Sequence, residues 1–154
     1  MKKVLFISST GGHLNELLKL EPLFKKYDSC IVVEKTKSNE DLRKKYHTYY
    51  LAYGTKSHIL PYIFIFPYNI LKSLILFIKI KPEVIITTGT HTAVPMCYIA
   101  KIFRKKVIYI ETFANINSKT VAGKMVYPIA DLFIVQWENM TKLYPKAVYG
   151  GWIF

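Results

Sequence analysis

The sequence predicts a doubly wound α/β domain, with a mostly parallel sheet and helices on both faces. Short apolar runs alternate with segments of helical periodicity along the whole chain. Most of these runs are continuous and rich in β-branched residues, which is typical of strands buried on both faces. No internal repeat, low-complexity tract or Gly/Ser linker interrupts the alternation. We therefore expect residues 1–154 to form a single domain.

The expected elements follow this alternation in order. The first strand contains the apolar run Val4–Ile7, after which Leu14, Leu17 and Leu18 recur at helical spacing. Proline is tolerated in the first turn of a helix but not in its interior, so Pro67 is expected to begin a helix. The expected strands are Lys3–Ser8, Cys30–Val33, Thr48–Leu51, Val84–Thr87, Val107–Ile110 and Leu132–Val135. The expected helices are His13–Tyr27, Asn39–Lys45, Pro67–Ile80, Thr92–Phe103, Thr120–Tyr127 and Glu138–Tyr144.

Composition restricts the possible partners. Lys and Arg number 22 against 10 Asp and Glu, a net charge of +12 that favours an anionic partner: nucleic acid, an acidic membrane or a phosphorylated substrate. We expect no nucleic acid, because no binding signature is present and the aromatic residues lie in apolar blocks. Cys30 and Cys97 form no C-x-x-C pair, so they are expected to be core thiols in a reducing cytosol, with no metal site. Met1-Lys2-Lys3 leads directly into a strand, so no signal peptide is expected.

The segment Thr10-Gly11-Gly12-His13 joins the first expected strand to the first expected helix. In open α/β sheets, ligands bind at such carboxyl-end loops, and helix N-termini attract phosphate. Glycines let the backbone approach a ligand closely, and His13 adds a titratable group. The alternative is a tight turn with an incidental histidine.

Two further loops end strands at the same expected edge of the sheet. Gly89, Thr90 and His91 follow the strand Val84–Thr87, and together with the first loop they could hold a diphosphate across a cleft. Glu111 ends the strand Val107–Ile110, where a carboxylate could act as a base or hold a sugar hydroxyl. The alternative for Glu111 is a helix-capping or salt-bridging acid.

Several common chemistries are disfavoured. The chain has no P-loop, no complete G-x-G-x-x-G, no nucleophile elbow and no H-E-x-x-H motif. Glu34 could mimic the ribose-binding acid of a dinucleotide fold, but the glycines that accompany such an acid are missing.

The segment Ile59–Ile80 is unusually apolar and has three possible interpretations. It can be a core helix, a membrane-surface helix whose lysines meet anionic head groups, or a transmembrane helix. A helix over Pro67–Ile80 reaches only about 21 Å, short of the roughly 30 Å hydrocarbon core. The apolar arc is Ile70, Leu71, Leu74, Ile75, Phe77 and Ile78, opposite Asn69, Lys72 and Lys79. The expected membrane contacts are Phe64, Phe66, Ile70, Lys72, Phe77 and Lys79.

Several motifs together carry a resemblance to a known family. They are Ser8-Ser-Thr-Gly-Gly-His13-Leu, Thr87-Thr-Gly-Thr-His91, Tyr109-Ile-Glu111-Thr-Phe-Ala114, the run Tyr127–Glu138 and Tyr144-Pro-Lys-Ala-Val-Tyr-Gly-Gly151. The chain resembles the acceptor-side subunits of two-component glycosyltransferases. These include bacterial capsule and exopolysaccharide proteins and the eukaryotic membrane subunit of the transferase that adds the second GlcNAc to dolichol-diphosphate-GlcNAc. It is similar, more distantly, to the N-terminal half of the GlcNAc transferase that completes the peptidoglycan lipid precursor.

The resemblance implies the Rossmann-like N-terminal half of a GT-B transferase, lying peripherally on the cytoplasmic face of the cell membrane. A donor-binding partner subunit would hold the UDP-sugar, and this chain would hold a polyprenyl-diphosphate-linked saccharide for inverting transfer without cofactor or metal. His13 is the first candidate for the base and Glu111 the second. The expected acceptor-binding residues are Thr10, Gly11, Gly12, Gly89, Thr90, His91 and Asn115. The expected partner contacts are Gly150, Gly151, Trp152 and Phe154.

The chain departs from the family pattern at two of these positions. Asn115 stands where many relatives carry Arg, and Trp152 stands where proline is common. Two other functions remain open. One is a non-catalytic membrane scaffold that recruits the partner, and the other is a free-standing nucleotide-binding enzyme that uses Glu34.

Overall fold

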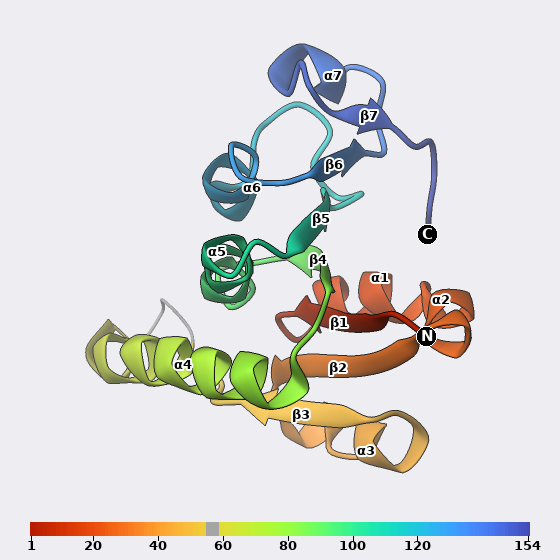
Figure 1. Ribbon diagram of the computed structural model, residues 1–154. Coiled ribbons are helices and arrows are strands. Elements are labelled where there is room, and N and C mark those ends of the chain that lie inside the picture. Colours follow the sequence, from red (N-terminus) through yellow and green to blue (C-terminus); the bar gives the residue numbers. More distant parts are fainter. Residues whose placement is uncertain (55–58) are drawn as a thin grey trace.

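The computed structural model describes the backbone of residues 1–54 and 59–154, together with the side chains of residues 1–54 and 63–154. Its strands form one seven-stranded parallel sheet in the order β3-β2-β1-β4-β5-β6-β7 (Figure 1). The strands are β1 (Lys3–Ser8), β2 (Asp28–Glu34), β3 (Thr48–Leu51), β4 (Val84–Gly89), β5 (Lys106–Ile110), β6 (Leu132–Val135) and β7 (Val148–Tyr149). The predicted fold class is confirmed. The strand β7 was not predicted, because two residues are too few to show the apolar pattern of a strand.

Helices cover both faces of the sheet (Figure 1). They are α1 (Gly12–Leu18), α2 (Glu21–Lys26), α3 (Leu42–Lys45), α4 (Ile59–Ile80), α5 (Val94–Ile102), α6 (Val121–Val126) and α7 (Met140–Leu143), with a 3₁₀ turn at Lys37–Asn39. The helices α1, α2 and α3 pack on one face, and α4, α5, α6 and α7 pack on the other.

The strand β1 shows why the apolar runs form strands. Leu5 and Ile7 pack in the cluster shared with α4 and α5, whereas Val4 and Phe6 pack in the cluster shared with α1 and α2. Successive side chains of a strand point to opposite faces of the sheet. Both faces of β1 are covered by helices, so a continuous apolar run is required there.

The order of the strands creates a crevice beside β1. The chain builds the sheet outward from β1 through β2 to β3, and then returns to place β4 on the other side of β1. The loops that leave β1 and β4 therefore diverge to opposite faces. Ligands bind in open α/β sheets at the carboxyl ends of two such strands. The loops containing His13 and Gly89 lie at this position.

Two expected helices are shorter or divided in the structure. The segment predicted as His13–Tyr27 divides into α1 and α2, with Pro22 in the first turn of α2. Proline in the interior of one long helix would lose a hydrogen bond and collide with the preceding turn. The segment predicted as Asn39–Lys45 consists of the 3₁₀ turn and the short α3.

The prediction that Pro67 begins a helix was wrong. The helix α4 begins at Ile59 and contains Pro67 in its interior. Pro67 leaves the carbonyl of Ile63 without its helical donor, and both residues are exposed there. At 22 residues, α4 is about 33 Å long. It is therefore long enough to span the roughly 30 Å hydrocarbon core of a membrane.

Candidate functional site

The loops that follow β1 and β4 are hydrogen-bonded to each other. The backbone N–H of Ser9 donates to the carbonyl of Gly89 at 3.0 Å. The Thr88 hydroxyl donates to the carbonyl of His13 at 2.8 Å. These bonds connect positions far apart in the sequence and bring the two glycine-bearing loops to one edge of the sheet, as expected from the topology.

Two glycines in these loops have backbone conformations that other residues rarely adopt. Gly11 has a φ of 76° and Gly89 a φ of 97°. A Cβ at Gly89 would lie 3.1 Å from the Tyr109 hydroxyl and 3.5 Å from the His13 ring. Gly89 is therefore favoured by its backbone conformation and by the closeness of the Tyr109 hydroxyl. Gly12 has open space around its Cα.

The orientation of the His13 ring is fixed by a backbone carbonyl. Its Nδ1 lies 2.7 Å from the carbonyl oxygen of Thr88. A carbonyl can only accept, so Nδ1 carries the proton and Nε2 of the neutral ring has a free lone pair. His13 lines the cavity described below, where a base could accept a proton.

Glu16 is a carboxylate near His13 that the sequence analysis missed. Its Oε1 accepts hydrogen bonds from the Thr112 hydroxyl at 2.7 Å and the Phe113 N–H at 3.1 Å. Its Oε2 lies 3.8 Å from Nδ1 of His13 and has no hydrogen-bond partner among the described residues. The i, i+3 spacing from His13 was the available signal, because it places both side chains on one helix face.

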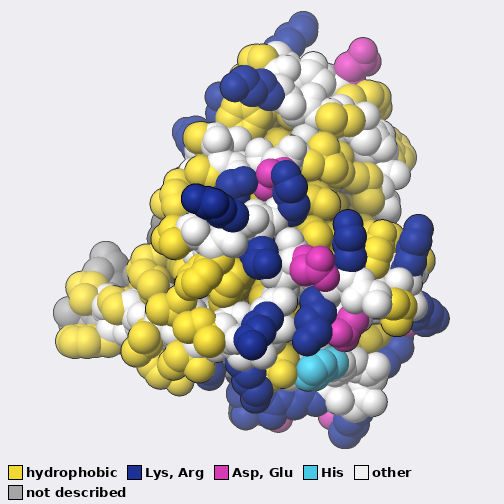
Figure 2. All heavy atoms as spheres, in the orientation of Figure 1, with side chains coloured by type: hydrophobic (Ala, Val, Ile, Leu, Met, Phe, Trp, Pro, Cys, Tyr) yellow, Lys and Arg dark blue, Asp and Glu magenta, His cyan; other side chains and the backbone are white. Residues whose placement is uncertain are grey.

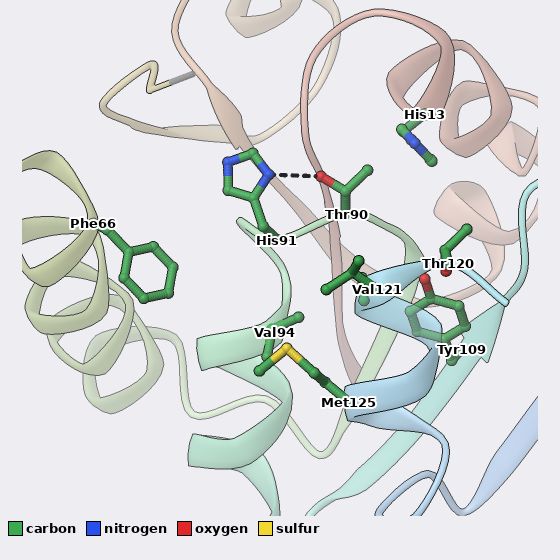
Figure 3. Close-up of a pocket in the computed structure, with 10 residues that line it drawn as sticks. His13, Phe66, Thr90, His91, Val94, Tyr109, Thr120, Val121 and Met125 are labelled. Atoms are coloured by element: carbon green, nitrogen blue, oxygen red, sulfur yellow. Dashed lines mark hydrogen bonds between the residues drawn. The ribbon is translucent and has the colours of Figure 1, made fainter. Parts of the chain in front are cut away.

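A cavity of about 460 Å³ opens beside the two loops. This volume is within the range of small-molecule sites. Figure 3 shows His13, Thr90 and His91 near one another, with Phe66 of α4 opposite Val121 and Met125 of α6. The cavity therefore has polar groups from the loops at one end and mostly apolar walls from three helices. The lining residues are His13, Phe66, Thr90, His91, Val94, Tyr109, Thr120, Val121, Ala122 and Met125.

Glu34 holds the second loop in place. Its side chain is buried, accepts a hydrogen bond from the Thr92 hydroxyl at 2.6 Å and lies 3.7 Å from Nε2 of His91. Thr10 lies nearby, 3.5 Å from the Asn39 amide nitrogen, which also donates to the Glu34 carbonyl. With its carboxylate engaged by Thr92, Glu34 is poorly placed to receive a ribose.

Glu111 lies inside the domain, 1% exposed. Its Oε1 accepts from the Thr112 N–H and the Thr120 hydroxyl, and its Oε2 accepts from the Tyr144 hydroxyl at 2.9 Å. Burial raises the pKa of Glu111 above its usual value, while the bonds from Tyr144 and Thr120 act in the opposite direction. The carboxylate therefore joins β5 to Thr120, which caps the N-terminus of α6, and to Tyr144 at the end of α7.

The remaining predicted residues lie outside the cavity. The Asn115 amide donates to the Ser118 carbonyl within its own loop, at 3.0 Å. In the C-terminal segment, the N–H of Gly150 donates to the Val135 carbonyl. Trp152 is 70% exposed and contacts the rings of Phe113 and Trp137 edge to face. In the aromatic cluster Phe113–Trp137–Trp152, Trp152 is thus accessible at the surface, whereas Phe113 and Trp137 are half-buried, as are Gly151 and Phe154.

The outward face of α4 is apolar, and its inward face carries polar groups. Asn69 and Ser73 are buried, and Asn69 bonds both the N–H and the carbonyl of Ala52. Figure 2 shows hydrophobic atoms gathered over α4, beside Lys and Arg side chains. The exposed stripe recurs every three or four residues along one side of the helix. It consists of Phe64, Tyr68, Leu71, Ile75 and Ile78.

The predicted membrane residues divide between the two sides of α4. Phe64 is 77% exposed and Ile70 is exposed, but Phe77 is 4% exposed and packs on Phe103 in the core, which corrects its assignment. Lys72 lies over the Tyr68 ring and Lys79 over the Tyr49 ring. By length and composition, Ile63–Ile80 is able to cross a membrane: its mean hydropathy is 1.8, and 22% of the stretch is buried.

Solved structures define the class of the domain. Acinetobacter baumannii MurG superposes with a TM-score of 0.72 at 15% identity, over 90% of this chain and 43% of that one. UDP-N-acetylglucosamine 2-epimerase from Rickettsia bellii gives 0.72 at 18% identity, over 94% and 41%. The chain thus spans less than half of each neighbour. It is a Rossmann-like domain of the type found in GT-B glycosyltransferases and related epimerases.

Sequence comparison then gives the family. The family model described as oligosaccharide biosynthesis protein Alg14 like matches residues 4–153. The protein named UDP-N-acetylglucosamine transferase subunit ALG14 in Candida albicans is 32% identical over 92% of this chain and 74% of its own length. The Mus musculus protein of that name is 28% identical over 97% and 82%. The chain belongs to the Alg14-like family.

Proposed function

We propose that this chain is the acceptor-binding, membrane-attached subunit of a two-component glycosyltransferase. One observation carries the proposal: the crevice that contains His13 lies beside the helix α4, whose exposed face is apolar. The names of the relatives, which describe UDP-N-acetylglucosamine transferase subunits, support transfer of a sugar from a UDP-sugar. A donor-binding partner subunit supplies the nucleotide site.

The acceptor is a polyprenyl-diphosphate-linked saccharide. Its diphosphate lies between the loops of Gly11–His13 and Gly89–Thr90, which are close enough to share one ligand. The net charge of +12 favours an anionic ligand of this kind. The biosynthetic context, capsule or exopolysaccharide, remains a prediction from the resemblance.

His13 acts as the base in this proposal. Nε2 removes the proton from the acceptor hydroxyl as that oxygen attacks the anomeric carbon, and UDP leaves from the opposite face with inversion. The bond from Nδ1 to the Thr88 carbonyl supports this role, because it keeps the lone pair on Nε2. No cofactor or metal is required, since cationic side chains can offset the charge on the leaving diphosphate.

The outward face of α4 attaches the chain to the cytoplasmic face of the membrane. A helix with one apolar face and flanking lysines binds at an anionic interface. Lys81 and Lys105 lie beside Ile78 and Phe103 at one end of this face and would meet the head groups. The aromatic cluster Phe113–Trp137–Trp152 is the proposed contact with the partner, since its Trp152 is exposed and tryptophans are frequent anchors of such interfaces.

Reconstitution tests the proposal directly. Transfer from a UDP-sugar to a lipid-diphosphate-linked saccharide is measured with this chain, with the candidate partner, and with both. Activity only with both chains is expected. Full activity from the partner alone would favour the scaffold alternative, and activity from this chain alone would reveal a nucleotide-sugar site within it.

A further inference from the structure

The cavity beside the two loops is polar at one end and mostly apolar along its walls, so it matches an amphiphilic molecule. His13, Thr90 and His91 lie at its polar end. Beyond them the walls consist of uncharged side chains, which are mostly apolar and come from α4, α5 and α6. The apolar ones are Phe66, Val94, Val121, Ala122 and Met125, and Tyr109 and Thr120 complete the lining. An anionic head group and an apolar chain attached directly to it would match both parts.

The helix α4 contributes to this cavity and to the exposed apolar face at the same time. Phe66 lines the cavity, whereas Phe64, two positions earlier, is exposed on the opposite side of the helix. On the other wall, Val121 and Met125 of α6 are lining residues that remain substantially exposed. The cavity is therefore open along α6 rather than sealed in the core.

We propose that this cavity binds the first isoprene units of the acceptor lipid, directly adjacent to the diphosphate. The inference rests on the proposed function and names a recognition element within it. Branched apolar units suit these walls, because the flexible, polarisable Met125 can adapt to an irregular chain. The lipid then contributes to acceptor affinity through a defined site, in addition to keeping the substrate in the membrane.

The binding experiment uses soluble probes with the assembled complex. Farnesyl diphosphate carries the diphosphate and three isoprene units, and inorganic diphosphate carries the head group alone. We expect farnesyl diphosphate to bind at least about tenfold more tightly than inorganic diphosphate. Each buried methylene group raises the binding affinity roughly fourfold. Equal affinities for the two probes would overturn the inference.

Cavity-filling variants test whether the isoprene units bind in this cavity. Met125→Trp or, where that variant fails to fold, Val121→Trp is expected to remove the preference for farnesyl diphosphate and leave inorganic diphosphate binding unchanged. Val148→Trp adds the same ring at an exposed position of β7, outside the cavity, and should keep the preference. A preference that persists in folded Met125→Trp and Val121→Trp, or that is lost in Val148→Trp, would show that the isoprene units bind elsewhere.

The transfer assay separates this inference from the proposed function. Normal transfer by the complex together with equal binding of both probes would overturn the prenyl site and leave the function intact. Tight, Met125-dependent binding of farnesyl diphosphate without any transfer would support the site and contradict the transferase proposal.

Discussion

Nδ1 of His13 lies 2.7 Å from the carbonyl oxygen of Thr88, so a residue on the first loop is oriented by the backbone of the loop that follows β4. Nearby, the Thr88 hydroxyl returns a bond to the His13 carbonyl. The two segments are 75 residues apart in the sequence. The hydrogen bond that joins the two loops therefore also orients the base proposed for catalysis.

His13→Ala is expected to lower kcat by about 100-fold or more in the reconstituted pair, because a positioned base contributes on this order. KM for the acceptor should change far less. Steady-state kinetics with purified subunits measure both constants. His47→Ala removes an exposed histidine that contacts Tyr49 outside the crevice, and it should leave kcat unchanged. Near-normal turnover by His13→Ala would remove His13 from the chemistry.

Gly89→Ala is expected to destabilise the fold by about 1–3 kcal/mol, because the new Cβ requires a strained conformation close to Tyr109. Gly12→Ala adds the same methyl group in open space and should stay within about 0.5 kcal/mol of wild type. Urea unfolding of the two variants measures the difference. Equal stabilities would mean that the loop relaxes around the new side chain.

Glu111→Ala is expected to cost on the order of 2 kcal/mol, because it leaves the Tyr144 hydroxyl and the Thr120 hydroxyl without their buried acceptor. Chemical denaturation provides the measurement. Glu111→Gln keeps the shape of the side chain and should retain most transferase activity if the residue is structural. Loss of turnover in a stably folded Glu111→Gln would favour the alternative role as a base.

The pH dependence of stability offers a separate test of Glu111. Burial raises its pKa in the folded state above the ordinary value of 4.5, so the folded state binds the proton more readily than the unfolded chain. This contribution to stability is present below about pH 4.5 and is lost as the pH rises through the folded-state pKa. Glu111→Gln lacks the titration, so its stability relative to wild type should improve from acidic to neutral pH. A constant difference would indicate an unshifted carboxyl group.

Leu71→Asp combined with Ile75→Asp should release the chain from anionic vesicles, lowering the partition coefficient by about tenfold or more. Lys72→Glu combined with Lys79→Glu should act in the same direction, because each lysine contributes on the order of 1 kcal/mol at such a surface. Vesicle sedimentation measures both pairs. Val148→Asp alters an exposed apolar residue of β7 and is expected to bind vesicles normally. Unchanged binding of both double variants would exclude this face.

Trp152→Ala is expected to weaken assembly with the donor-binding subunit by about tenfold or more, as expected for an exposed aromatic anchor. Titration calorimetry of the two subunits gives the dissociation constant. Tyr149→Ala removes another exposed ring, outside the Phe113–Trp137–Trp152 cluster, and should have a smaller effect. A larger effect from Tyr149→Ala would show that the interface lies at the β7 edge of the sheet instead.

The sequence predicted the strands well, because residues such as Leu5 and Phe6 must be apolar on both faces of the sheet. It also predicted that the loops of His13 and Gly89 lie at the same edge of the sheet. The partners of Glu16 could not be inferred, since its contact with Thr112 spans 96 positions and depends on the completed fold. The i, i+3 spacing places Glu16 on the same helix face as His13, but it does not identify the groups that Glu16 binds.

Which face of α4 is buried could not be predicted from the sequence either. Asn69 was assigned to the polar side of the helix, but it is buried because its amide satisfies the backbone of Ala52 after β3. Local periodicity cannot identify such a partner. Phe77 consequently faces the core, and the exposed stripe is centred on Leu71 and Ile75 instead.

The pair of bonds between Asn69 and Ala52 has a geometric consequence. They join α4 to the residue that follows β3, and so they set which face of the helix is turned away from the sheet. In the proposed complex, a surface that binds the apolar face is therefore positioned relative to His13 by the fold. In that complex the fold, rather than a flexible tether, determines how far a lipid-linked sugar must extend from the bilayer to reach the crevice.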